Sequence, residues 1–241
     1  MMAGGTGQKK KKDDQLLFSE AQKALDVKDY VDAIDLFQTF AERFPKSDYY
    51  TWALQRLGES LEGLLDLEYR KRVENGEQES EVKKEFLSTH GHYGCWEETP
   101  DGLKYNLMHY KNILVKFPDS AISDEAAYKV IPWEKDYKGS PDGPLREITH
   151  LEQILERYPS TSLRCEILYK MARRCHIVYE IYAFSPSTGT RDREKAEQYR
   201  NNALYLYKLA LKSPRHTKYS QKAWEGLTML EEGKGRIYIL E

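Results

Sequence analysis

The chain has 241 residues, of which 40% are hydrophobic and 32% are charged. This composition supplies enough apolar material for a core inside a heavily solvated surface, and the length suits one large domain or two small ones. The formal net charge of −2 excludes the basic excess that a broad nucleic-acid surface needs, so we expect no nucleic-acid partner.

The first residues are rich in glycine and lead into four consecutive lysines, Lys9 to Lys12. We predict a disordered, solvated basic tail over residues 1–14, with contact to an anionic surface as the alternative. No apolar segment follows the lysines, so the sequence as it stands predicts no export signal. No stretch approaches the ~20 apolar residues that a membrane span requires, and we expect no transmembrane segment.

Four segments end in the same way, with a helix that stops at a proline and a hydroxyl residue within three positions after it. The prolines are Pro45, Pro118, Pro159 and Pro214. Proline cannot continue a helix, whereas Ser or Thr can cap the next one, so each copy predicts the turn of a helical hairpin. In the first copy, Phe37, Phe40 and Phe44 precede the proline at spacings of three and four, which places them on one helical face.

The prolines are unevenly spaced, and the additional residues lie in segments rich in turn formers. We predict a loop insert at about residues 70–102 and shorter ones at 132–144 and 185–193. Residues 236–240 could form one short edge strand, but a frayed C-terminal tail over residues 233–241 is the favoured interpretation.

The first unit of this pattern matches the tetratricopeptide repeat (TPR). The positions that fall on the TPR spacing are Ala21, Tyr30, Ala33, Phe37 and Pro45. Small residues at two of these positions let paired helices approach closely, and the aromatic rings fill the groove between them. More narrowly, residues 18–47 resemble the opening repeat of the BamD family, the TPR lipoproteins of the outer-membrane β-barrel assembly machinery. Related proteins of the Tol-Pal system look similar.

The resemblance is strongest over about residues 15–65 and extends more weakly to about residue 230. It implies a scaffolding role in a bacterial cell-envelope complex, located in the envelope or periplasm and associated with the membrane only peripherally, through a partner. Members of this family carry an export signal and a lipidated cysteine near the start, whereas the first cysteine here is Cys95. A cytoplasmic location is therefore the alternative.

The segment from His90 to Glu98 contains the densest group of potential metal ligands. His90, His92 and Cys95 could bind a transition metal, because imidazole and thiolate are common ligands. Their spacing matches no familiar zinc pattern, so incidental loop residues are the favoured interpretation. Trp96 could instead anchor the insert to the body of the protein or to a partner.

The three cysteines, Cys95, Cys165 and Cys175, cannot all pair within the chain, so no disulfide framework is expected. Cys175 and His176 could suggest a nucleophile and its base, but adjacent helical residues point ~100° apart, so a core cysteine beside a surface histidine is favoured. No phosphate-binding loop, zinc-protease motif or hydrolase motif appears. We therefore expect no cofactor and no enzyme, with a metal- or thiol-dependent enzyme as the remote alternative.

Aromatic residues in the predicted helices could line a peptide-binding groove, because stacked helical hairpins curve and present a concave surface. The candidates are Tyr49, Tyr50, Trp52, Tyr199, Tyr205, Tyr207 and Tyr219. Arg56, Arg173 and Arg174 are candidate anchors for a carboxylate of the partner.

Together these patterns predict an all-α protein, an α-solenoid of about four to five TPR-like helical hairpins over residues 15–232. The predicted function is a non-catalytic protein–protein interaction scaffold whose partners are other proteins of a multi-subunit assembly. A BamD-like subunit of a cell-envelope complex is the first hypothesis. The second is a cytoplasmic TPR adaptor or a structural subunit of another large complex.

Overall fold

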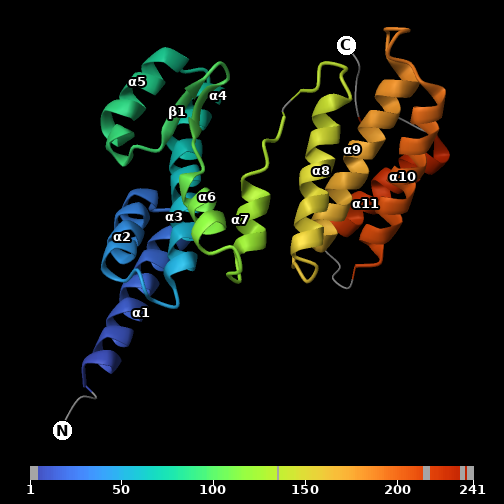
Figure 1. Ribbon diagram of the computed structural model, residues 1–241. Coiled ribbons are helices and arrows are strands. Elements are labelled where there is room, and N and C mark those ends of the chain that lie inside the picture. Colours follow the sequence, from blue (N-terminus) through green and yellow to red (C-terminus); the bar gives the residue numbers. More distant parts are fainter. Residues whose placement is uncertain (1–4, 135, 214–217, 234–236, 238–241) are drawn as a thin grey trace. The chain divides into compact units, whose positions relative to one another are not determined.

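The computed structural model describes residues 5–134, 136–213, 218–233 and 237, with side chains from residue 13 onward. The chain separates into two compact units, residues 1–130 and 131–241. In the described ranges both units consist of helices, apart from one two-stranded sheet (Figure 1). The prediction of an all-α fold built from helical hairpins is therefore confirmed, and the predicted run over residues 15–232 is divided between the two units.

The first unit is a series of helices in which each packs against the next. These are α1 (Gly5–Asp26), α2 (Tyr30–Arg43), α3 (Tyr50–Leu65), α6 (Met108–Lys116) and α7 (Ser123–Lys129). Asp29 begins α2 as a helix cap, because its carboxylate accepts a hydrogen bond from the backbone N–H of Asp32 at 3.3 Å. The predicted stripe of Phe37, Phe40 and Phe44 on α2 is buried in the core.

The start of α1 corrects the prediction of a disordered tail over residues 1–14. Helix α1 begins at Gly5, and Asp14 is buried, where its carboxylate accepts a hydrogen bond from Ser47 Oγ at 2.6 Å. The predicted disorder is therefore wrong for residues 5–14. Residues 1–4 and the side chains of the four lysines lie outside the described residues.

The segment predicted as a loop insert at 70–102 is largely structured, so that prediction was wrong. It lies between the π-helical turn η1 (Asp66–Arg70) and the strand β2 (Gly102–Tyr105). It contains α4 (Lys71–Glu74), α5 (Glu79–His90), the 3-10 turn η2 (Gly91–Tyr93) and the strand β1 (Trp96–Thr99), which pairs with β2. Val82 and Phe86 lie one helical turn apart on α5 and both are buried against the core. His90 occupies the next position of this stripe, and because it is not apolar, the helical spacing of apolar residues is short in the sequence.

The second unit contains α8 (Asp142–Arg157), α9 (Arg164–Phe184), α10 (Arg193–Leu211) and α11 (Lys218–Glu232). Helix α9 packs against the other three helices, which explains why both of its faces are apolar. Residues 185–192 form a loop as predicted, and the described residues of 132–141 contain no helix or strand.

The predicted C-terminal tail, residues 233–241, is described only at Gly233 and Ile237, so the possible edge strand at 236–240 lies mostly outside the described residues. Ile237 packs against Ile177 and Ile181, and its backbone N–H donates a hydrogen bond to Glu180 Oε1 at 3.0 Å. This contact fixes one point of the tail on α9.

Close helix packing in the first unit predicts that Gly58→Ala destabilises the protein by about 1–2 kcal/mol, although alanine favours helix more than glycine does. A Cβ atom at Gly58 of α3 would lie 2.7 Å from Cζ of the buried Tyr110 ring. Gly91→Ala is the matched control, because Gly91 has a φ of −60° and no atom within 4 Å of the added methyl. Urea denaturation followed by circular dichroism measures both variants. Equal stability of Gly58→Ala and the wild type would contradict this packing.

Candidate functional site

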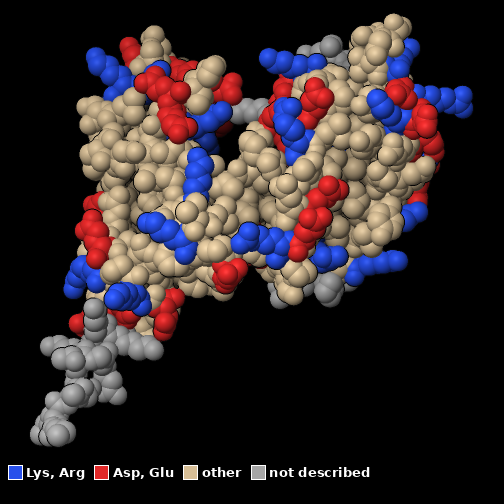
Figure 2. Space-filling view, viewed as in Figure 1, with Lys and Arg blue, Asp and Glu red and all other residues tan. Residues whose placement is uncertain are grey.

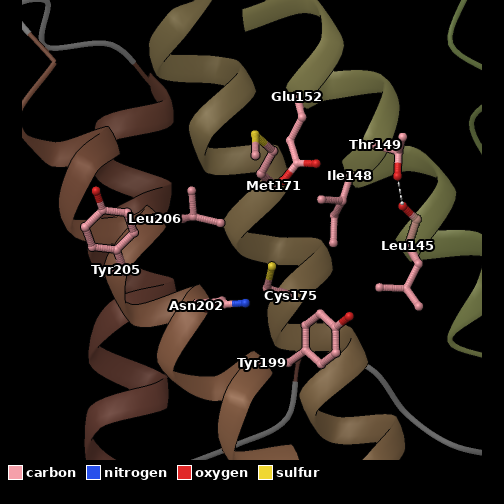
Figure 3. Close-up of a pocket in the computed structure, with 10 residues that line it drawn as sticks. All are labelled: Leu145, Ile148, Thr149, Glu152, Met171, Cys175, Tyr199, Asn202, Tyr205 and Leu206. Carbon is pink, nitrogen blue, oxygen red and sulfur yellow. Dashed lines mark hydrogen bonds between the residues drawn. The ribbon is translucent and has the colours of Figure 1, made fainter. Parts of the chain in front are cut away.

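The second unit has a groove of about 420 Å³ between α8 and α10, with α9 at its base (Figure 3). Its lining residues are Leu145, Ile148, Thr149 and Glu152 from α8, Met171 and Cys175 from α9, and Tyr199, Asn202, Tyr205 and Leu206 from α10. In Figure 3 the α8 side chains lie on one side of the groove and Asn202, Tyr205 and Leu206 of α10 on the other, with Met171 and Cys175 between them and Tyr199 below Cys175. Three helices of one unit therefore build a single concave surface.

The helical period explains which residues reach the groove. On α8, Ile148 and Thr149 follow Leu145 by three and four positions, and Glu152 follows them by four and three, which places all of them on one face. Met171 and Cys175 are one turn apart on α9, and Asn202 and Leu206 are one turn apart on α10. Thr149 Oγ1 donates a hydrogen bond to the carbonyl oxygen of Leu145 at 3.1 Å, so this hydroxyl is satisfied within its own helix.

The groove has an apolar base and a more exposed rim. Ile148, Met171 and Cys175 are buried, whereas Glu152 and Asn202 are exposed at the edges. Tyr205 is 63% exposed, although tyrosine is a residue of intermediate burial in folded proteins. An apolar base with a polar rim is typical of surfaces that bind other molecules.

The electrostatics of the groove are dominated by Glu152. Partial burial raises the pKa of Glu152, and the neighbouring carboxylate of Glu156 raises it further. Burial raises the pKa of the Cys175 thiol to about 12, with a further contribution from Glu152. The thiol is therefore protonated at neutral pH and acts as part of the apolar base rather than as a nucleophile.

The neighbour of this thiol, His176, corrects a prediction. His176 was expected on the surface, but it is 2% exposed, and its Nε2 lies 3.4 Å from Glu180 Oε1. The reason is that α9 is covered by α8, α10 and α11. Cys175 is a core residue, as predicted.

Of the predicted aromatic candidates, the groove brings together Tyr199 and Tyr205. Tyr207 is 1% exposed, and a Cβ atom at Gly226 would lie 2.5 Å from its ring, so its predicted contact with a partner is wrong. Two positions along α10 rotate a side chain by about 200°, which moves it from the exposed rim to the core. Tyr219 packs beside Tyr169, with ring centroids 5.7 Å apart.

The other aromatic candidates belong to the first unit. Tyr49 packs against Phe18 with ring centroids 5.1 Å apart, and Tyr50 packs edge-on against Phe117 at 5.5 Å. Trp52 is half-buried against the same core. These rings contribute to packing between the helices of that unit and line no part of the groove on α8, α9 and α10.

The predicted arginine anchors differ in exposure. Arg174 is buried, with its Nε 2.6 Å from Glu147 Oε2, so its predicted role as an anchor for a partner is wrong. Arg173 is half-buried. Arg56 is half-buried, and its Nη1 lies 2.5 Å from Glu59 Oε2.

The weak metal candidate of His90, His92 and Cys95 is not supported by the geometry. His90 is buried with Nε2 2.7 Å from Glu68 Oε2, while the exposed His92 places Nδ1 3.0 Å from the carbonyl oxygen of Thr89. Burial raises the pKa of the Cys95 thiol to about 12. Across the described ranges, no three His, Cys, Asp or Glu side chains are grouped closely enough to hold a metal ion.

Trp96 anchors the insert within the first unit. Its Nε1–H donates a hydrogen bond to the carbonyl oxygen of His90 at 2.7 Å, and its ring packs edge-on against Phe86 at 5.1 Å. The hairpin of β1 and β2 is thereby attached to α5 and to the core, which is one of the two roles predicted for this tryptophan.

A second hollow, in the first unit, was missed by the sequence analysis. It has a volume of about 410 Å³ and lies where the turn between α1 and α2 meets the end of α3 and η1. Val27 and Leu67, which line it, are 76% and 46% exposed. The signal in the sequence is weak, because each is a single apolar residue between two charged ones.

Within the described part of the chain, no helix is both long and apolar enough to cross a bilayer. Figure 2 shows lysine and arginine side chains interspersed with acidic ones on the face that it draws. This mixture agrees with the formal net charge of −2.

No protein-family model matches this chain, and no curated protein sequence matches it. The groove is therefore interpreted from its own residues.

Proposed function

We propose that this chain is a non-catalytic protein–protein interaction scaffold, and that the groove on α8, α9 and α10 is one of its binding sites. The observation that carries the proposal is the exposed ring of Tyr205 on a groove whose apolar lining includes Met171 and Leu206. Binding energy at protein interfaces concentrates on aromatic side chains next to apolar pockets. Helices also present grooves of this kind to amphipathic partner segments.

The construction of the groove supports this role. All of its lining residues lie on α8, α9 and α10, and α9 packs against both of the other helices. A surface held by packed helices changes little when a partner binds, so less conformational entropy is lost on association.

We propose further that the scaffold serves a bacterial cell-envelope complex as a BamD-like subunit. The support is the resemblance of residues 15–65 to the opening repeat of that family. A cytoplasmic adaptor remains the alternative. Affinity isolation from the native organism, with mass spectrometry of the retained proteins and of the N-terminus of this chain, separates the two. Recovery of outer-membrane barrel-assembly subunits with a processed N-terminus would support the first, and an intact N-terminus with only cytoplasmic partners would contradict it.

Replacing Tyr205 with alanine is expected to weaken capture of the groove's partner about tenfold, because an aromatic anchor is lost. Folding stability should stay within about 0.5 kcal/mol of the wild type, since the ring is 63% exposed. Trp224→Ala is the matched control: Trp224 is 58% exposed in the same unit but does not line the groove. Quantitative co-purification of the partner measures both variants. Equal losses for both would argue against a site in the groove.

A further inference from the structure

We propose that the groove between α8 and α10 recognises a basic amphipathic segment of a partner protein, with an apolar side chain in the groove and a Lys or Arg beside Glu152. This inference rests on the proposed scaffold function and specifies the chemistry of the partner. It is carried by the charges around the groove and by the position of its apolar base.

The apolar part of the groove can hold a large side chain. The base and walls include Ile148, Met171 and Leu206, and the ring of Tyr205 extends the apolar surface outward. The volume of about 420 Å³ lies within the range of ~300–1,000 Å³ that is typical of binding pockets. An aromatic or aliphatic anchor of the partner would therefore bury its surface here.

The charge of the groove is negative. Glu152 carries the formal charge of the lining, which includes no lysine, arginine or histidine. Among the described residues, no side chain forms an ion pair or hydrogen bond with Glu152, and the like charge of Glu156 acts on it. The charge of Glu152 also acts on the other two helices of the groove. It contributes to raising the pKa values of Cys175 on α9 and of Tyr199 on α10.

A carboxylate beside an apolar surface attracts a cation more strongly than one surrounded by water, because the local dielectric constant is lower. A Lys or Arg of the partner would relieve the repulsion between Glu152 and Glu156 at the same time. An acidic segment with the same apolar residues would add a further negative charge, so the groove should discriminate between the two by charge.

The test uses the full chain and two fluorescently labelled amphipathic helical peptides. Both have the same apolar stripe of Leu and Phe, and their polar faces consist of Lys in one and Glu in the other. Fluorescence anisotropy titrations should show that the Lys peptide binds at least about tenfold more tightly. Tyr205→Ala should weaken its binding about tenfold, which locates it in the groove.

Variants of Glu152 test the charge. Glu152→Gln should weaken binding of the Lys peptide about threefold to fivefold, and Glu152→Lys should reverse the preference between the peptides. Glu194→Gln is the matched control, because it removes an exposed carboxylate of α10 that does not line the groove. Equal losses for Glu152→Gln and Glu194→Gln would mean general attraction by the acidic surface and would overturn the inference.

The remaining outcomes separate this inference from the proposed function. If both peptides bind equally and only Tyr205→Ala weakens them, the groove binds segments without regard to charge, so the inference fails and the scaffold proposal stands. If neither peptide binds but a native partner is captured through Tyr205, the inference also fails and the scaffold proposal stands. If neither peptide binds and no partner is captured, both proposals fail.

Discussion

Arg174→Met is expected to lower the free energy of unfolding of the second unit by about 3–5 kcal/mol, the cost of leaving a buried charge without its partner. The side chains of Arg174 and Glu147 are 6% and 1% exposed, and Arg174 Nε lies 2.6 Å from Glu147 Oε2. The guanidinium also lies over the ring of Trp133, 4.9 Å from its centroid. Removing the arginine therefore leaves the buried carboxylate of Glu147 without its charged partner.

Glu147 also organises the segment that precedes α8. Its Oε1 accepts a hydrogen bond from the backbone N–H of Glu134 at 2.8 Å, and its Oε2 accepts one from Tyr137 Oη at 3.0 Å. If Glu147 becomes protonated or moves toward water in the absence of Arg174, these contacts weaken. We expect faster hydrogen exchange in residues 131–141 and in α8.

Urea denaturation followed by tryptophan fluorescence gives the loss of stability, and hydrogen exchange assigns it to the second unit. In Arg174→Met with Glu147→Gln the buried charge is absent, so we expect this double variant to be more stable than Arg174→Met alone. Lys170→Met is the matched control, because Lys170 Nζ lies over the same Trp133 ring, 5.3 Å from its centroid. Among the described residues, Lys170 forms no ion pair with a buried carboxylate. A change of less than about 1 kcal/mol in Arg174→Met, or equal effects of Arg174→Met and Lys170→Met, would contradict the argument.

The helical period made the core of α2 predictable, because the pattern is local. Phe37, Phe40 and Phe44 follow one another at helical spacing and end at a proline, and the structure buries all three. Capping residues and proline stops depend on the same few neighbours, so they can be recognised without knowledge of the tertiary contacts.

The structured insert could not be predicted in this way, because distant contacts stabilise it. Tyr69 Oη donates a hydrogen bond to Glu79 Oε1 at 2.6 Å and accepts one from the backbone N–H of Leu103 at 3.2 Å. These contacts join η1, α5 and β2, and no spacing in the sequence indicates them. Turn residues such as Asn75 and Gly76 instead suggested a loop.

The candidate site was only partly predictable, because residues one or two positions apart on a helix differ in how far other helices cover them. Tyr205 and Tyr207 look alike in the sequence, yet one is 63% exposed and the other is in the core. Arg173 and Arg174 differ in the same way, because Glu147, 27 residues earlier, pairs with the second of them. The apolar residues of α8 at the groove follow a helical period, but that period alone does not show which face another helix covers.

Acidification is expected to destabilise the first unit through His109. Its Nδ1 lies 2.6 Å from Tyr105 Oη, which accepts a hydrogen bond from the backbone N–H of His109 at 3.2 Å. The phenol can donate its hydrogen to Nδ1 of the neutral imidazole. Burial lowers the pKa of His109 to about 4, below its ordinary value of about 6.5.

Since the folded-state pKa is lower than the unfolded one, the unfolded chain binds a proton that the folded chain does not at pH values between about 6.5 and 4. The stabilisation is present above pH 6.5 and is lost as the pH falls toward 4, by up to about 3 kcal/mol. His109→Gln can still accept the hydrogen bond from Tyr105 but does not titrate. The stability advantage of the wild type over this variant should therefore shrink by about 2 kcal/mol between about pH 7.5 and pH 4.5.

Urea denaturation at each pH measures this difference, and acid-sensitive groups shared by both proteins cancel in it. His92→Gln is the matched control for the loss of an imidazole from the same unit, because His92 is exposed. A constant difference between the wild type and His109→Gln over this pH range would show that His109 gains its proton as readily in the folded chain as in the unfolded one. In that case burial would not hold the imidazole in its neutral form.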